Sequence, residues 1–147
     1  MKDISNKNHS NRRAVAQAVL YASTEAMTHL RKGTLPKGDA LLVAKVAAIQ
    51  AAKNTPQIIP YCHPLQLEHV SVDFDLQKNH VTATVEVAAF YKTGVEMEAL
   101  TAATVAALTL YDMMKPVDPM LRIDDIVLVK KTGGKSDINL KPKRKNE

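Results

Sequence analysis

Small apolar residues alternate with larger ones near the start of the chain, which is the pattern of a β-strand. Over residues 13–23 one face of such a strand carries Ala14, Ala16, Ala18 and Leu20. The opposite face carries Val15, Gln17, Val19 and Tyr21. Because none of these side chains is charged, the pattern predicts a strand that is covered on both faces.

Two further stretches, residues 68–77 and 80–90, alternate with the same period. Their apolar positions are Val70, Val72, Phe74 and Leu76, followed by Val81, Ala83, Val85 and Val87. Polar residues on the other face of the first stretch, such as Asp73, indicate a half-exposed strand. The short segment 77–79 between the two predicts a hairpin turn. Residues 122–131 predict a final strand.

Two segments are predicted to be helices, residues 39–54 and 94–112. The first is rich in alanine, has no internal glycine or proline, and begins with Asp39, a residue type that caps helix N-termini. The second is apolar around nearly its whole circumference.

Glycines and prolines predict the irregular segments. Gly33, Pro36 and Gly38 mark residues 27–39 as a connection. The prolines of residues 55–64 predict that this segment has no regular structure.

The resulting order of elements is β, α, β, β, α, β. Two helices packed on one face of an antiparallel sheet of this order form the α+β, ferredoxin-like sandwich. We therefore expect residues 1–147 to be a single domain with a short polar N-terminal arm and a basic C-terminal tail at about residues 137–147.

Composition narrows the possible functions. The formal net charge is +5 over 147 residues, and the last seven residues contribute +3 through four basic residues and Glu147, which leaves +2 for the remainder. With only four tyrosines and two phenylalanines to stack on bases, we expect no nucleic-acid partner. Cys62 is the only cysteine, so no internal disulfide is possible.

The N-terminal residues lack the apolar core of a signal peptide, and no uncharged stretch is long enough to span a bilayer. We expect a soluble, cytoplasmic protein with no membrane partner.

The helix at residues 94–112 combines two different apolar stripes. One consists of the small residues Ala99, Ala102, Ala103, Ala106 and Ala107. The other is bulkier and consists of Leu100, Thr104, Leu108 and Tyr111. One sheet face cannot cover such a helix alone, so we expect a second subunit to cover it, with the alanine stripe as the contact. A helix buried within one subunit is the alternative.

The carboxylates of this helix lie at its two ends. Glu98 and Asp112 are fourteen residues apart, which corresponds to a rise of about 21 Å along a straight helix. They cannot act on the same atom from one helix. Either each belongs to a separate site, or a two-fold axis brings one end of the helix near the other end of its partner; we favour the second arrangement.

Several short motifs carry candidate chemistry. The segment "GGKS" at residues 133–136 is not a phosphate-binding P-loop, because Val129 stands where the first glycine is needed. It predicts instead a flexible loop whose lysines, Lys130, Lys131 and Lys135, hold phosphate. Further lysines that would suit a triphosphate are Lys37, Lys45, Lys53 and Lys115, although each alone is typical of a solvated surface.

His63, in "YCHP", is either an ordinary loop histidine or a group that donates protons or orients a base. A nucleophilic Cys62–His63 pair is not expected, because adjacent residues of an extended chain point to opposite sides. The spacing of His69 and His80 matches no strong metal site, so we expect no metal ligands.

Four segments together resemble a known family. They are "KGD" at 37–39, "AAIQAAKNTPQIIPYCHP" at 47–64, "KTGVEMEALTAATVAALTLYDM" at 92–113 and "KKTGGKSD" at 130–137. In this order and spacing they resemble the molybdenum cofactor biosynthesis protein C family, the cyclic pyranopterin monophosphate synthases. "DIS" at 3–5 is similar to the family's start, so the resemblance covers nearly the whole chain.

The resemblance implies a ferredoxin-like lyase that assembles as a homohexamer, a trimer of dimers, with active sites at subunit interfaces. The implied substrate is 3′,8-cyclo-7,8-dihydro-GTP, and the implied products are cyclic pyranopterin monophosphate and pyrophosphate, in molybdenum cofactor (molybdopterin) biosynthesis. It implies no protein cofactor, and Mg²⁺ is the cation expected to accompany the triphosphate.

The resemblance also implies roles for individual residues. The catalytic positions are Asp112, Lys115 and Lys53. The substrate-binding positions are Tyr61, Cys62, His63, Met97 and Glu98, with Lys37, Glu96 and Lys131 as more peripheral members. We expect the lysines to stabilise the leaving pyrophosphate, Asp112 to shuttle protons, and Glu98 and His63 to orient the base.

This chain departs from the family at two positions, with Tyr61 where leucine is common and Tyr91 where glycine is common. Two non-enzymatic interpretations also stay open. An RNA-binding sheet would need exposed aromatic residues on its central strands, where the chain has residues such as Thr82 and Thr84. An oligomeric scaffold would explain the alanine stripe but not the surrounding lysines and carboxylates.

Overall fold

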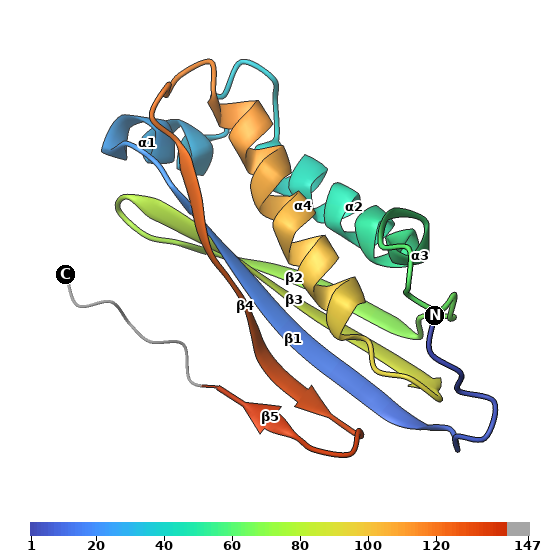
Figure 1. Ribbon diagram of the computed structural model, residues 1–147. Coiled ribbons are helices and arrows are strands. Elements are labelled where there is room, and N and C mark those ends of the chain that lie inside the picture. The colour runs from blue at the N-terminus through green and yellow to red at the C-terminus, as the bar shows by residue number, and fades with distance from the viewer. Residues whose placement is uncertain (141–147) are drawn as a thin grey trace.

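The computed structural model describes residues 1–140, which form an antiparallel sheet of order β2-β3-β1-β4-β5 with helices on one face (Figure 1). The strands are β1 (Ser10–Tyr21), β2 (His69–Leu76), β3 (His80–Tyr91), β4 (Arg122–Thr132) and β5 (Ile138–Asn139). The helices are α1 (Thr24–Lys32), α2 (Ala40–Lys53), α3 (Thr55–Ile58) and α4 (Glu96–Met114).

The order of the four long strands confirms the predicted α+β, ferredoxin-like arrangement. β5 adds a short fifth strand that the sequence patterns did not indicate. Residues 141–147 of the predicted basic tail lie outside the described residues. Within residues 1–140, no helix combines the length and the apolar character needed to cross a bilayer.

The central strand β1 is covered by helices on one face only. Ala14, Ala16, Ala18 and Leu20 are at most 1% exposed beneath the helices. The residues of the opposite face, from Val15 to Tyr21, are half-buried between the neighbouring strands β3 and β4. The expectation that both faces are covered is therefore wrong for the single chain.

The structure corrects the prediction for residues 27–39, because the first part of that segment belongs to helix α1. Ser23 caps this helix by accepting a hydrogen bond from the backbone N–H of Ala26 at 3.2 Å. Gly33 ends it in the left-handed conformation, with φ of 65°. α3 is a single turn with a proline at its start, where a missing N–H does no harm.

The alanine stripe of α4 packs inside the subunit rather than against a second one. Its five alanines are at most 1% exposed, because α2 and the sheet cover them. The small side chains allow α2 and α4 to approach closely. The bulkier stripe is the one that faces outward, and Leu108 is 56% exposed. The predicted role of the alanine stripe as a subunit contact is thus wrong.

α2 also has an exposed apolar surface. We call the exposed apolar residues of the two long helices the outer helix face; they are Leu42, Val43 and Val46 of α2 and Met97 and Leu108 of α4. Large apolar side chains exposed in this number on one layer are typical of a contact surface.

The buried carboxylate of Asp118 ties two distant parts of the chain together. It lies in the α4–β4 loop, is 4% exposed, and accepts hydrogen bonds from the backbone N–H groups of Ser23 at 2.6 Å and Met120 at 2.8 Å. Although burial alone would raise the pKa of Asp118, these hydrogen bonds lower it. The carboxylate therefore fixes the start of α1 against the turn that follows α4.

We expect Asp118→Ala to lower the free energy of unfolding by about 2–4 kcal/mol at neutral pH, because it leaves the two N–H groups without their charged acceptor. Since the pKa of Asp118 is lower in the folded than in the unfolded chain, its contribution is present at neutral pH and is lost as the pH falls through the folded-state pKa. Urea unfolding at several pH values measures this difference. A difference that does not shrink in acid would contradict the electrostatic explanation.

Candidate active site

Three charged side chains meet at the C-terminal end of α4, and we call them the lysine–aspartate cluster. Asp112 forms ion pairs with Lys37 at 2.7 Å and with Lys115 at 2.8 Å. Lys37 comes from the loop before α2, so residues that are distant in sequence converge here. The three side chains are 39–54% exposed. A ligand can reach all of them from solvent.

The two lysines determine the protonation of Asp112. Hydrogen bonds from Lys115 and then Lys37 lower the pKa of Asp112 to about 2. The carboxylate in turn raises the pKa of Lys115. Asp112 is therefore ionised at neutral pH, and two lysines beside this one carboxylate give the cluster a net positive charge that suits an anionic ligand.

A second group of ionisable residues lies at the N-terminal end of α4, and we call it the glutamate cluster; its members are Glu96, Glu98, Lys131 and Cys62. Lys131 of β4 forms an ion pair with Glu96 at 3.2 Å. Glu98 is only 3% exposed. Burial raises the pKa of Glu98, and the neighbouring charge of Glu96 raises it further.

Cys62 belongs to this cluster because its thiol lies within electrostatic range of Glu98. Burial raises the pKa of Cys62, and the charge of Glu98 adds to the effect. His63 follows directly in the chain and is half-buried. Tyr61 is 76% exposed, so the tyrosine at this position does not narrow the site within one chain.

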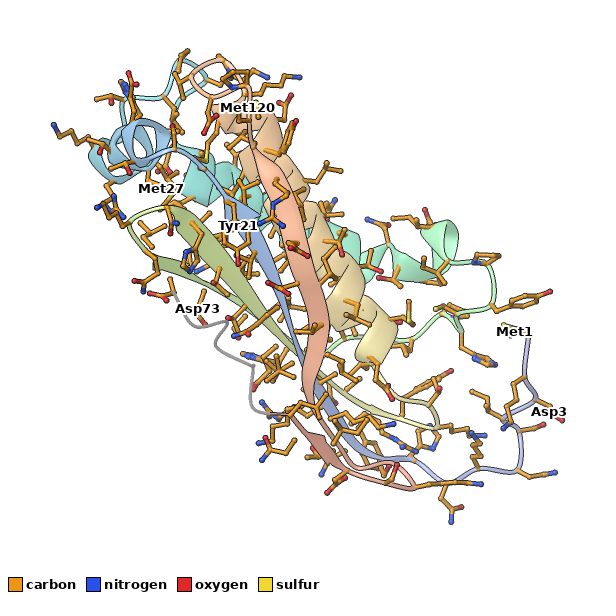
Figure 2. The ribbon with its side chains drawn as sticks, turned by 60° about the vertical axis from the view of Figure 1, so that its left-hand side comes forward. Met1, Asp3, Tyr21, Met27, Asp73 and Met120 are labelled. Atoms are coloured by element: carbon orange, nitrogen blue, oxygen red, sulfur yellow. The ribbon has the colours of Figure 1, made fainter. Side chains whose placement is uncertain are left out.

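The two clusters stand at opposite ends of one helix. Glu98 and Asp112 both lie within α4, so the rise of the helix separates them by about 21 Å. In Figure 2, Met120, which follows the C-terminal end of α4, lies at one end of the molecule, and Met1 and Asp3 lie at the other.

Lys53 does not join Asp112 and Lys115. It is the last residue of α2, whereas the start of α2 follows Lys37 and lies beside Asp112. α2 and α4 therefore run antiparallel, and Lys53 lies toward the glutamate cluster. The three residues expected to be catalytic are thus divided between the two ends of the α2–α4 helix pair, with Asp112 and Lys115 at one end and Lys53 at the other.

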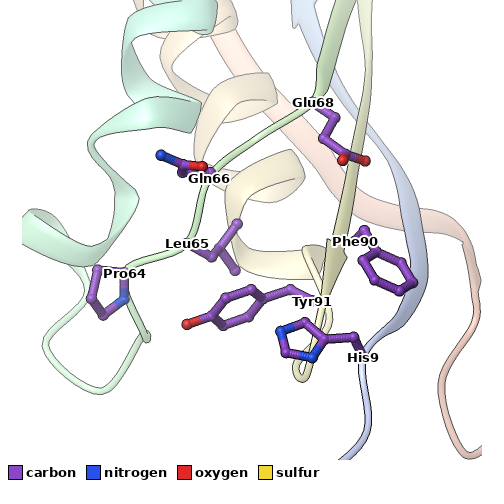
Figure 3. A pocket seen from close by; sticks show the side chains of 7 residues that line it. All are labelled: His9, Pro64, Leu65, Gln66, Glu68, Phe90 and Tyr91. Carbon is purple, nitrogen blue, oxygen red and sulfur yellow. The ribbon is translucent and has the colours of Figure 1, made fainter.

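An open hollow lies beside His63, and its lining residues are His9, Pro64, Leu65, Gln66, Glu68, Phe90 and Tyr91 (Figure 3). It is open to solvent and has a volume of about 620 Å³. His9 stacks on Phe90 and meets Tyr91 edge-on, each with ring centroids 5.6 Å apart. None of the expected site residues lines this hollow, although Tyr91 is one of the two departures from the family.

The loop between β4 and β5 is held in place by β1. Gly133 has φ of 84°, and a Cβ atom there would lie 1.8 Å from the backbone oxygen of Asn11, so only glycine fits. Ser10 donates a hydrogen bond to the carbonyl of Gly133 at 2.8 Å. The lysine-bearing loop that we expected to be flexible is therefore anchored, and Lys131 is directed to Glu96.

The part of the chain that the structure describes contains no group of three histidine, cysteine, aspartate or glutamate side chains suited to bind a metal ion. His69 instead lies 3.8 Å from Glu86 on the sheet.

Comparison with known proteins shows which family and which proteins the chain is similar to. Residues 1–134 match the MoaC family. The chain is 49% identical over 138 residues to a cyclic pyranopterin monophosphate synthase of Clostridium perfringens (strain 13 / Type A), a match that covers 92% of this chain and 87% of that protein.

Similar proteins with the same name occur in other bacteria. The chain is 48% identical to that of Listeria monocytogenes serotype 4a (strain HCC23), over 92% of this chain and 86% of the other. It is also 48% identical to that of Thermoanaerobacter sp. (strain X514), over 94% of this chain and 89% of the other. The chain belongs to the MoaC family.

Proposed function

We propose that this protein is a cyclic pyranopterin monophosphate synthase, a lyase of molybdenum cofactor biosynthesis. It converts 3′,8-cyclo-7,8-dihydro-GTP to cyclic pyranopterin monophosphate and releases pyrophosphate. The observation that carries this proposal is the lysine–aspartate cluster, in which two accessible cations flank one ionised carboxylate. The names of the relatives support the same activity.

The lysines are suited to the triphosphate of this substrate. Lys37 and Lys115 are half-exposed, so they can turn from Asp112 toward phosphate oxygens without disturbing the core. Positive charge near the departing phosphates stabilises the pyrophosphate as its negative charge develops. Lys53 and Lys131 add cations at the other end of the helix pair.

The same exchange of partners activates Asp112. In the free chain both lysines hold its pKa at about 2, which makes it a weak proton acceptor at neutral pH. When phosphate draws the lysines away, the carboxylate loses two charged hydrogen bonds and its pKa rises. Asp112 then accepts and returns protons as the purine ring opens and the pterin ring closes.

The glutamate cluster orients the base part of the substrate. Glu98 is buried and has a raised pKa, so its carboxyl group favours hydrogen bonds to a bound ligand over contact with water. His63 lies next to this cluster, in residues 61–63. Its ring nitrogens can donate or accept a further hydrogen bond to the base. Met97, which is 39% exposed, provides an apolar contact beside Glu98.

A complete site requires two subunits in this proposal. Within one chain the two clusters are about 21 Å apart. One small substrate cannot contact both of them at the same time. A two-fold axis across the outer helix face would bring the lysine–aspartate cluster of one subunit to the glutamate cluster of its partner. The exposed apolar residues Leu42, Val46 and Leu108 support such a contact. We propose that three such dimers form a homohexamer.

The proposed chemistry uses side chains of the protein and needs no resident cofactor. Mg²⁺ would enter with the triphosphate as part of the substrate. The substrate derives from GTP, which supports a location in the cytoplasm.

Purified protein incubated with 3′,8-cyclo-7,8-dihydro-GTP is expected to release pyrophosphate and to yield a product that becomes a fluorescent pterin on oxidation. Coupled phosphate detection and fluorescence measure the two products separately. Omission of the protein is the control. A correctly assembled protein that forms neither product would contradict the enzymatic proposal and favour a scaffold.

A further inference from the structure

The hollow of Figure 3 has an aromatic wall, which we call the ring shelf; its residues are His9, Phe90 and Tyr91. The ring of His9 stacks on that of Phe90 with an angle of 26° between their planes, and it meets Tyr91 at 90°. Phe90 is nevertheless 53% exposed. Aromatic rings that pack together without being buried offer a surface on which a flat ring system can stack.

The backbone that carries the ring shelf is held in place. The guanidinium of Arg12 donates hydrogen bonds to the carbonyls of Tyr91 at 3.3 Å and Lys92 at 3.4 Å. On the other side of the hollow, the backbone N–H of Glu68 donates to the carbonyl of Ala88 at 2.9 Å. Both walls are therefore attached to β3, and the hollow is formed before any ligand arrives.

The wall opposite the ring shelf carries two polar side chains, Gln66 and Glu68. In Figure 3 the carboxylate of Glu68 lies on the same side of the hollow as the ring of Phe90. Within residues 1–140, no ion pair joins Glu68 to a cationic side chain. A carboxylate can accept two N–H groups side by side, and the amide of Gln66 can donate one. This set of groups complements a ring edge with an amino group, a ring N–H and a carbonyl.

A second hollow adjoins the first and adds a cation. It has a volume of about 390 Å³, shares Leu65, Gln66 and Glu68 with the first hollow, and is also lined by Lys53. Lys53 is the last residue of α2 and is exposed. Its ammonium group suits a phosphate. The two hollows together therefore offer a stacking surface, hydrogen-bonding groups for a ring edge and a positive charge.

We propose that the ring shelf binds a ring with the guanine edge, as part of a purine nucleotide or of a pterin. The ring stacks on Phe90 and Tyr91, Glu68 accepts its amino group and its ring N–H, and Gln66 donates to its carbonyl. The phosphate of a nucleotide is directed to Lys53. The volume of about 620 Å³ is within the range of small-molecule sites.

This site goes beyond the proposed lyase reaction, because no residue of the ring shelf belongs to the lysine–aspartate cluster or to the glutamate cluster. Tyr91 also stands where glycine is common in the family. The ring shelf therefore distinguishes this chain from the family members that have glycine there.

Titration with GMP and IMP tests the site directly, because IMP differs from GMP only in lacking the amino group. We expect GMP to bind saturably and to shift the ring signals of His9, Phe90 and Tyr91 in nuclear magnetic resonance spectra. IMP should bind about tenfold more weakly, because it loses one hydrogen bond to the charged Glu68.

Two variants separate the hydrogen bonds from the stacking. Glu68→Gln should reduce the preference for GMP over IMP to within about twofold, since the charged acceptor is gone. Glu25→Gln makes the same change on the exposed start of α1, at the other end of the sheet, and should leave both affinities unchanged (Figure 1). Phe90→Leu should weaken GMP and IMP equally, by about fivefold or more, because stacking does not depend on the amino group.

A soluble pterin distinguishes the two sources of the ring, because it has the same edge without ribose or phosphate. Tighter binding of GMP supports a nucleotide as the occupant, and tighter binding of the pterin supports a pterin. Shelf signals that none of the three ligands shifts would overturn the proposal, as would unchanged GMP affinity in both Glu68→Gln and Phe90→Leu. The measurement is one of binding, so a protein that binds GMP but forms no product would contradict the proposed function and leave this site intact.

Discussion

The Asp112→Asn variant is expected to turn over 3′,8-cyclo-7,8-dihydro-GTP at least about 100-fold more slowly than the wild type, because the amide cannot accept a proton. The variant should fold normally, since Asp112 is exposed and its ion pairs within residues 1–140 are those with the two lysines. Lys37 and Lys115 remain available for phosphate, so the loss should appear in kcat more than in KM. Pyrophosphate release under saturating substrate measures the effect.

Asp73→Asn is the control for this variant, because it removes an exposed carboxylate remote from both clusters. It should retain wild-type turnover. If Asp112→Asn assembled natively and formed product at an unimpaired rate, the assignment of Asp112 as the proton carrier would be wrong.

A mixture of Glu98→Gln subunits with Asp112→Asn subunits is expected to recover activity that neither variant has alone. If each site takes Glu98 from one chain and Asp112 from its two-fold partner, half of the randomly mixed dimers contain both variants. Each mixed dimer has one intact site, so about a quarter of all sites are restored. Turnover measured after subunit exchange, with exchange verified by native mass spectrometry of differently tagged chains, tests this.

A mixture that recovers no activity would be equally informative. If Glu98 and Asp112 of one chain served the same site, every site in every mixture would carry one damaged residue. Complete exchange without recovered turnover would then exclude the shared site and would require α4 of a single chain to serve a ligand about 21 Å long.

Local sequence patterns were sufficient for most of the fold. The alternation over β3 and the Asp39 cap of α2 act through neighbouring residues, so their effect is visible in the sequence. The cap signals of α1, Ser23 and Gly33, were present as well. They were outweighed because the glycines and prolines of the following loop made the whole segment resemble a connection.

The orientation of α4 shows what periodicity cannot decide. The spacing of the alanines established that they share one face, but not which surface covers that face. Close packing of α2 against α4 favours the smallest side chains, so the alanines lie inside the subunit and Leu108 lies outside. The choice depends on the volume between two helices, which is a tertiary property.

The candidate site, too, was only partly predictable from the sequence. The separation of Glu98 and Asp112 followed from helix geometry alone. The partners of Asp112 did not, because Lys37 reaches it from a loop 75 residues earlier. Nothing near Asp118 in sequence indicated that it would bind the backbone of Ser23, 95 residues away. Such contacts arise from the folded arrangement of the elements.

The position of Cys62 gives this protein a built-in probe. It is the only thiol of the chain, so an alkylating reagent can attach at one position only. Burial and the charge of Glu98 raise its pKa, so the thiol is largely protonated at neutral pH and reacts slowly with such reagents. The rate of alkylation therefore reports how accessible the glutamate cluster is to a reagent in solution, without any change to the amino-acid sequence.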